Sequence, residues 1–134
     1  PRFLNLFKPL FTDKLPAFER AKQRLAAGAS VGIFPEGTVN RNPHELLKGF
    51  YGAAQLSLEA GVPLLPVGVQ FPTNPPGEPI RESSPLILEI GQPLVPESKI
   101  AQPSSEQVRE WHARMMQEIG RLSGKQWQPN HQRK

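Results

Sequence analysis

The sequence predicts an α/β domain in which helices flank a partly parallel sheet. Three amphipathic segments have helical spacing, and short apolar runs bounded by glycine and proline have the length of strands. Because the two patterns alternate along the chain, we expect the helices to pack against a shared sheet. The 134 residues, of which 37% are hydrophobic and 21% charged, suffice for one folded domain.

Helices are expected at residues 16–27, 44–60 and 104–122. Gly28 and Gly61 are natural ends for the first two, because glycine readily adopts the positive φ of a helix terminus. The expected apolar positions are Phe18, Ala21 and Leu25 in the first helix, Leu47, Phe50, Ala54 and Leu58 in the second, and Val108, Trp111, Met115, Ile119 and Leu122 in the third.

The third helix has the clearest start signal. Ser104 and Gln107 have the spacing of a capping box. The stripe that contains Trp111 is interpreted as core packing rather than a membrane or partner face. His112 is expected on an exposed flank of this helix.

Strands are expected at residues 30–34, 64–71 and 86–90, with a proline-rich loop at 72–85. Pro66 cannot donate to a strand ladder, so it indicates an edge, a bulge or the start of the second strand. Three strands are few for an open sheet, and we expect at least one more before Pro1. The chain begins with Pro instead of Met, which favours a piece of a longer protein or a processed product.

Composition excludes several classes of site. The chain has no cysteine, which excludes disulfides, cysteine zinc sites and a cysteine nucleophile. Its net charge of +4 suits a phosphate group or an anionic membrane surface without requiring one. No metal-ligand spacing, glycine-rich phosphate loop or nucleic-acid motif is present, so neither a metal nor a nucleic-acid partner is expected.

The most informative stretch lies where the first predicted strand ends. Ligand sites in open α/β sheets favour the carboxyl ends of strands. There Glu36 can accept hydrogen bonds from a polyol, Gly37 allows close backbone approach, and Thr38 can donate to an oxyanion. Arg41 and Lys48 follow, and either could hold a phosphate. An ordinary turn with a solvated Glu36 explains these residues about equally well.

Two motifs add a family resemblance. Phe34-Pro35-Glu36-Gly37-Thr38 resembles the third motif of the glycerolipid, or lysophosphatidic acid, acyltransferases, which reads Phe-Pro-Glu-Gly-Thr-Arg-Ser. Val62-Pro63-Leu64-Leu65-Pro66-Val67 is similar to their fourth motif, Val-Pro-Ile-Val-Pro-Val. Leu47-Lys48-Gly49 lies between them as in the family, and Leu10-Phe11-Thr12-Asp13-Lys14 resembles the second motif more loosely. The resemblance covers about residues 10–122.

The chain departs from the family pattern in two places. Val39 stands where the family has Arg, so Arg41 is a candidate to replace its phosphate contact, with Lys14 as a second. The family's catalytic pair is a His followed, after four residues, by an Asp, and it precedes the second motif. Here no histidine precedes Lys14, and the fifth residue after His44 is Gly49. The catalytic pair is therefore not in this sequence.

The resemblance implies an acyltransferase of phospholipid biosynthesis or remodelling. Its acyl donor would be a thioester, either acyl-CoA or acyl carrier protein, and its acceptor a glycerol phosphate or a lysophospholipid, with no bound cofactor. It also implies association with the cytoplasmic face of a membrane. Because the general base is missing, we expect this chain alone to be inactive; the alternative is a non-catalytic module that binds an anionic lipid headgroup.

The resemblance also assigns parts of the chain. Residues 1–122 are expected to form an incomplete acyltransferase domain, and residues 123–134 a flexible polar tail in which Trp127 is the apolar exception. No catalytic residue is assigned. The expected acceptor-binding residues are Glu36, Gly37, Thr38, Arg41 and Lys14, and the residues expected to shape the pocket are Pro35, Pro63 and Pro66.

Overall fold

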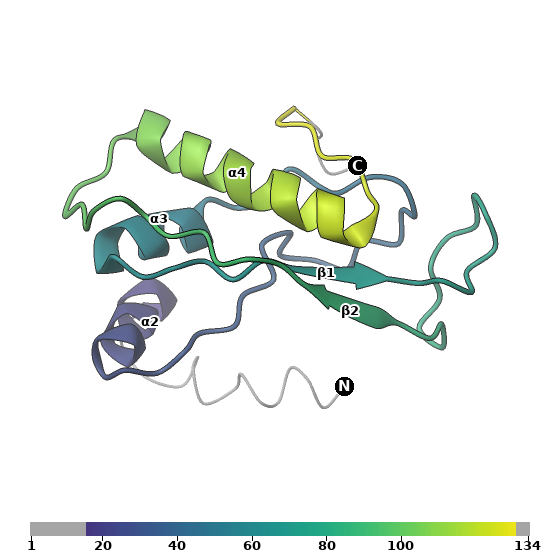
Figure 1. Cartoon of the computed structure of the whole chain (residues 1–134), viewed down its shortest axis with the longest axis horizontal. Helices are drawn as coiled ribbons and strands as arrows, with labels where there is room; N and C mark the ends of the chain where they lie inside the picture. The colour runs from purple at the N-terminus through teal and green to yellow at the C-terminus, as the bar shows by residue number, and fades with distance from the viewer. Residues whose placement is uncertain (1–15, 131–134) are drawn as a thin grey trace. The chain divides into compact units, whose positions relative to one another are not determined.

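The computed structural model describes residues 16–130, and these form a small α/β structure. Its elements follow in the order α2 (Ala17–Ala26), α3 (Gly52–Ala60), β1 (Val67–Gln70), β2 (Ile87–Ile90) and α4 (Ser105–Ser123) (Figure 1). The chain divides into two compact units between Ile33 and Phe34. The α/β class is as predicted, whereas the parallel part of the sheet is not found among the described residues.

In the first unit, α2 agrees with the predicted helix to within a residue at each end. Pro16 precedes it, and Gly28 follows with φ +84°, the left-handed conformation expected of a helix stop. The strand predicted at 30–34 is wrong, because this backbone is neither helix nor strand and Ile33 is 45% exposed. An apolar run becomes a strand only when a neighbour supplies hydrogen-bond partners, and no described residue pairs with this one.

The second predicted helix is shorter than expected, because α3 begins at Gly52 instead of residue 44. Residues 44–46 run alongside the C-terminal segment: the amide of Leu46 donates to the carbonyl of Gln126, and that of Gln126 donates to His44, each at 2.8 Å. Gly49 then adopts φ +81°, which no right-handed helix accommodates. Tertiary pairing therefore replaces the predicted first turns of the helix.

The sheet is an antiparallel pair, with Val67 opposite Ile90 and Gln70 opposite Ile87. The prediction of parallel strands is wrong here because β1 and β2 are consecutive and joined by a loop, whereas a parallel connection needs a crossover, usually a helix. Pro66 is buried immediately before β1, where its carbonyl accepts the amide of Gly91 at 2.9 Å. Of the three interpretations of this proline, the structure shows the strand entry.

Helix α4 packs over α3 and the sheet in the second unit and contributes five of the eleven buried hydrophobic residues among those described (Figure 1). Its capping box is confirmed: the amide of Gln107 donates to Ser104 Oγ at 3.1 Å, and the Ser104 amide donates to Gln107 Oε1 at 2.9 Å. The predicted core stripe is also confirmed, because the buried or partly buried residues of α4 that pack in the core include Val108, Trp111, Met115 and Ile119.

Two close contacts explain how α4 approaches its neighbours. A Cβ atom on Gly68 of β1 would lie 2.4 Å from the backbone carbon of Leu122, so only glycine fits there. Against α3, the indole of Trp111 donates to Ser57 Oγ at 3.0 Å, and that hydroxyl donates to Val62 O at 2.6 Å. This buried polar group is therefore satisfied at the centre of an apolar interface.

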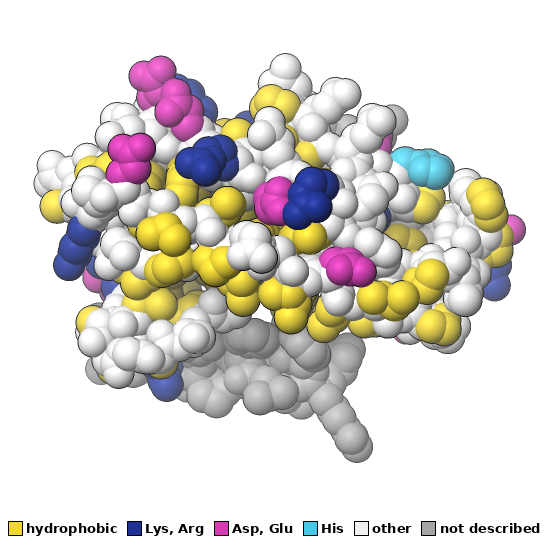
Figure 2. Space-filling model, viewed as in Figure 1, with side chains coloured by type: hydrophobic (Ala, Val, Ile, Leu, Met, Phe, Trp, Pro, Cys, Tyr) yellow, Lys and Arg dark blue, Asp and Glu magenta, His cyan; other side chains and the backbone are white. Residues whose placement is uncertain are grey.

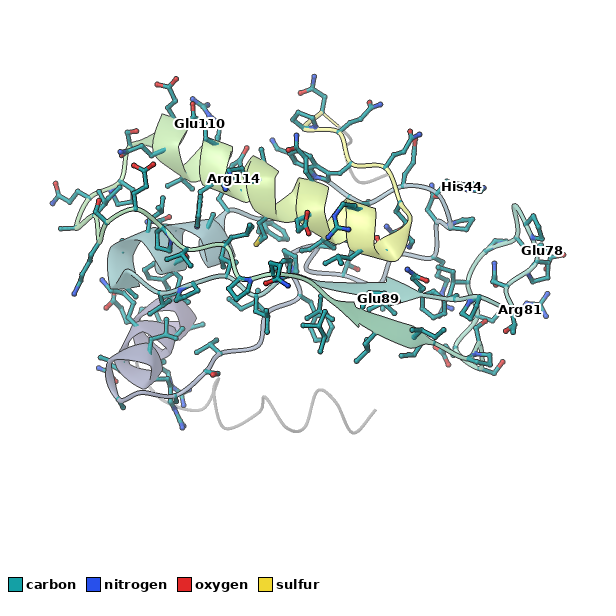
Figure 3. The ribbon with its side chains drawn as sticks, viewed as in Figure 1. His44, Glu78, Arg81, Glu89, Glu110 and Arg114 are labelled. Atoms are coloured by element: carbon teal, nitrogen blue, oxygen red, sulfur yellow. The ribbon has the colours of Figure 1, made fainter. Side chains whose placement is uncertain are left out.

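The outer strand of the sheet leaves apolar side chains exposed. Every residue of β2 is exposed, and hydrophobic side chains gather along the sheet in the face shown in Figure 2. Helix α4 also presents charged side chains to solvent, and Glu110 points away from the core in Figure 3.

Candidate functional site

The stretch singled out in the sequence forms a tight turn at the start of the second unit. The amide of Gly37 donates to the carbonyl of Phe34 at 3.0 Å, and Gly37 has φ +68°, where a side chain would be strained. The carbonyl of Pro35 accepts the amide of Phe50 at 2.8 Å. This bond, between residues 35 and 50, ties the turn to the segment 47–50.

Glu36 fixes the same two segments through its side chain. Its Oε2 accepts the side-chain amide of Asn40 at 2.7 Å and the backbone amide of Leu47 at 2.8 Å. Asn40 also donates to the carbonyl of Glu45 at 2.8 Å. The carboxylate is thus a half-buried junction whose position is set by three parts of the loop, and it is more constrained than the solvated turn residue of the alternative interpretation.

Gly37 and Thr38 follow Glu36 on the surface, and both are exposed. Val39, at the position where the resembling family has Arg, is 77% exposed. Thr38 therefore presents accessible polar groups beside a fixed carboxylate, whereas the amide of Gly37 is already bound to Phe34 O. This arrangement suits the recognition of a small polyol or phosphate, because carboxylates accept hydroxyl hydrogen bonds and exposed backbone amides can donate to anions.

Arg41 is turned toward another part of the chain. Its Nη1 donates to the carbonyl of Ile80 at 3.0 Å, and its Nη2 pairs with Glu82 at 3.2 Å. The side chain of Arg41 is 47% exposed and that of Glu82 is 89% exposed, so this ion pair contributes little to stability. Lys14 lies outside the described residues. Pro35 belongs to the turn, whereas Pro63 and Pro66 lie at the entry to β1.

Lys125 is close enough to Glu36 for the two charges to interact, and the sequence analysis did not single it out. Burial lowers the pKa of the Lys125 ammonium, and the nearby charge of Glu36 acts in the opposite direction. Lys125 and His44 also line a cavity of about 340 Å³ beyond the C-terminal end of α4. The C-terminal end of a helix carries a partial negative charge, which offsets the positive charge of the lysine there.

A second missed feature lies next to the turn, at Lys48. Its carbonyl oxygen is 2.8 Å from His112 Nε2 and 3.1 Å from Trp127 Nε1. The expectation that His112 is exposed is wrong: it is 1% exposed, because the rings of Tyr51 and Trp127 pack edge-on against it. A lone Trp127 in a polar tail was the signal in the sequence that this segment contacts the core.

No group of three His, Asp or Glu side chains that could hold a metal ion occurs among residues 16–130. Within the same range, no helix combines the length and apolarity that crossing a bilayer requires.

Comparisons with known proteins give a family match over part of the chain. Residues 10–70, which include the Glu36 turn, match the model of the acyltransferase family. The chain is also 33% identical over 89 residues to a Schizosaccharomyces pombe protein named as an uncharacterized acyltransferase; this alignment covers 61% of the chain but only 12% of the relative. No solved structure gives a significant match. Together the matches show that part of the chain is similar to an acyltransferase domain.

Proposed function

We propose that this chain supplies the acceptor-binding part of an acyltransferase of phospholipid biosynthesis or remodelling. The acyl group would pass from a thioester of coenzyme A or acyl carrier protein to a hydroxyl of a glycerol phosphate or lysophospholipid. The observation that carries the proposal is the Glu36 turn, which lies in the matched residues 10–70 and whose carboxylate is held by two hydrogen bonds. We expect the protein to act at a membrane surface.

The residues of this chain would bind and orient the acceptor. The Glu36 carboxylate can accept a hydrogen bond from a glycerol hydroxyl, while the exposed Thr38 can donate to the phosphate beside it. Gly37, whose own amide is bound to Phe34 O, leaves room for the acceptor to approach the backbone closely. Holding the acceptor in one orientation accelerates the attack of its hydroxyl, because the entropy of alignment is lost on binding. Proton removal from that hydroxyl needs a general base, and the sequence contains no His followed five positions later by Asp.

Binding can be tested without catalysis. We expect titration of the chain with glycerol 3-phosphate to shift the backbone amide resonances of Gly37 and Thr38, and Glu36→Gln to weaken this binding about tenfold or more. Thr73→Ala, at an exposed position in the loop between the strands, is the control and should bind as the native chain does. Unchanged resonances at the turn of a folded chain would refute the acceptor site.

One alternative is a non-catalytic module that binds an anionic lipid headgroup, which the net charge of +4 would suit. The two functions differ when the chain is extended upstream through any His-x-x-x-x-Asp pair. An acyltransferase then acylates the acceptor, whereas a headgroup module binds vesicles containing phosphatidic acid and transfers nothing.

A further inference from the structure

The Lys48 carbonyl is held from two directions by ring N–H groups. His112 comes from the middle of α4, and Trp127 comes from the segment after that helix. Most backbone carbonyls in a loop accept one hydrogen bond or bind water. Two buried or half-buried aromatic donors on one carbonyl oxygen are therefore an unusual arrangement. They fix the peptide that joins Lys48 to Gly49.

This peptide belongs to the segment that holds the Glu36 turn. One residue before it, the Leu47 amide donates to Glu36 Oε2; just after it, the Phe50 amide donates to Pro35 O. Segment 47–50 therefore faces the turn with its amides and faces α4 with its Lys48 carbonyl. A shift of the Lys48 peptide would move the Leu47 donor away from the carboxylate.

Gly49 permits the close approach of His112. With φ +81°, it turns the chain, and a Cβ atom there would lie 3.0 Å from His112 Cε1 and 3.3 Å from Met116 Sδ. The Lys48-Gly49 pair noted in the sequence is thus the position where the imidazole packs directly against backbone. Because this contact is tightly packed, the His112 ring cannot tilt without moving segment 47–50.

The contacts of His112 specify one form of its ring. Because Lys48 O is an acceptor, Nε2 carries the proton, and the buried Nδ1 has no hydrogen-bond partner. The titratable groups facing it are Tyr51, at 4.8 Å between ring centroids, and Lys48, whose ammonium lies 5.6 Å over the Tyr51 ring. A second proton on the imidazole would be buried beside this cation and without an acceptor.

We propose that neutral His112, together with Trp127, is a positioning residue for the acceptor site: the pair clamps the Lys48 carbonyl and so places the Leu47 amide that holds Glu36. Neither ring is a catalytic residue, because both act through the backbone of segment 47–50. The importance of this clamp for acyl transfer rests on the proposed function, whereas its mechanical action on Glu36 does not.

Backbone amide hydrogen exchange tests the clamp directly in this chain. His112→Phe keeps a ring but loses the N–H. We expect it to speed exchange of the Leu47 amide about fivefold, which corresponds to the net free energy of one hydrogen bond. His112→Gln, whose side-chain amide can reach the same carbonyl, should restore most of the protection. His44→Gln, at an exposed histidine, is the matched control and should change nothing.

A reporter remote from the clamp separates positioning from general stability. The Leu64 amide donates to the carbonyl of Leu94 at 2.9 Å, in a pairing that shares no residue with the clamp or the Glu36 turn. Its exchange should change far less than that of Leu47; equal acceleration of both amides would overturn the proposal. Trp127→Phe, which removes only the other donor, should likewise act on Leu47 alone and serves if His112→Phe does not fold.

Acyl transfer gives an independent result in a form extended through any His-x-x-x-x-Asp pair. There, His112→Phe should raise the KM for the acceptor several-fold and change kcat less, because it disturbs acceptor placement. An unchanged KM would overturn the link between clamp and acceptor. If no form transfers acyl groups, the proposed function fails, and the hydrogen-exchange result still decides whether His112 holds the Glu36 segment.

Discussion

At the scale of residues, Glu36 combines a structural and a binding role. Its Oε2 accepts hydrogen bonds from Asn40 and Leu47, so removing the carboxylate by Glu36→Ala would leave two donors without their partner. Loss of such bonds costs about 1–3 kcal/mol. Glu36→Gln is therefore the better probe, because an amide oxygen keeps one acceptor for the Leu47 amide while it removes the negative charge.

Gly49 offers a prediction about the same loop. Gly49→Ala combines backbone strain at φ +81° with a contact of 3.0 Å to His112, and we expect it to destabilise the chain by about 2 kcal/mol. Gly124→Ala has similar strain at φ +71° in open space and should cost about 1 kcal/mol. Urea unfolding would measure both.

The control for this pair is Gly52→Ala, at a position with ordinary φ and no atom within 4 Å of the added methyl group. It should be neutral or slightly stabilising, because alanine favours helix at the start of α3. Equal effects of the substitutions at Gly49 and Gly124 would show that the imidazole does not crowd the Lys48-Gly49 backbone.

At the scale of elements, local signals were reliable and long-range ones were not. The start of α4 follows from its own Ser104 and Gln107, and the end of α3 follows from Gly61 at φ +68°. The first turns predicted for the second helix failed because Leu46 pairs with Gln126, a partner 80 residues away that no local pattern indicates. Likewise, an apolar run at 30–34 does not reveal whether another strand will pair with it.

The capping box of α4 gives a prediction at this scale. Ser104→Ala removes the acceptor for the Gln107 amide and should destabilise the second unit by about 1 kcal/mol. Ser105→Ala, one residue later and inside the helix, should be nearly neutral. Thermal or urea unfolding would check both, and equal stabilities for the two variants would show that the box contributes nothing.

At the scale of the whole molecule, the candidate site depends on contacts between segments that are far apart in the sequence. The sequence located Glu36, Gly37 and Thr38 as one turn because they are adjacent. It could not show that α4 and Trp127 support that turn through Lys48, because His112 looked like an exposed flank residue and residues 123–134 like a polar tail. The second layer of the site is therefore visible only in the fold.

Burial of His112 predicts a pH dependence of global stability. Desolvation is the largest influence on the pKa of this imidazole and lowers it below the usual 6.5, with Lys48 adding to the effect and the backbone hydrogen bond opposing it. Below pH 6.5 the unfolded chain therefore binds a proton that the folded chain rejects, and stability falls as pH decreases toward the lowered pKa. The urea midpoint should drop between pH 7.5 and 5.

Two histidine variants test whether His112 causes this pH dependence of stability. His112→Gln should flatten this pH dependence, whereas His44→Gln should retain it, because His44 is exposed. A slope that survives in His112→Gln would mean that another group governs acid stability.

The most direct test of the account is acylation of lysophosphatidic acid by a labelled acyl thioester. It compares this chain, a form extended upstream through any His-x-x-x-x-Asp pair, and the extended form carrying Glu36→Gln. We predict turnover only in the extended native form, with a loss of at least tenfold in kcat/KM in the variant. Turnover by the extended form that Glu36→Gln leaves unchanged would contradict the assignment of the Glu36 turn to acceptor binding.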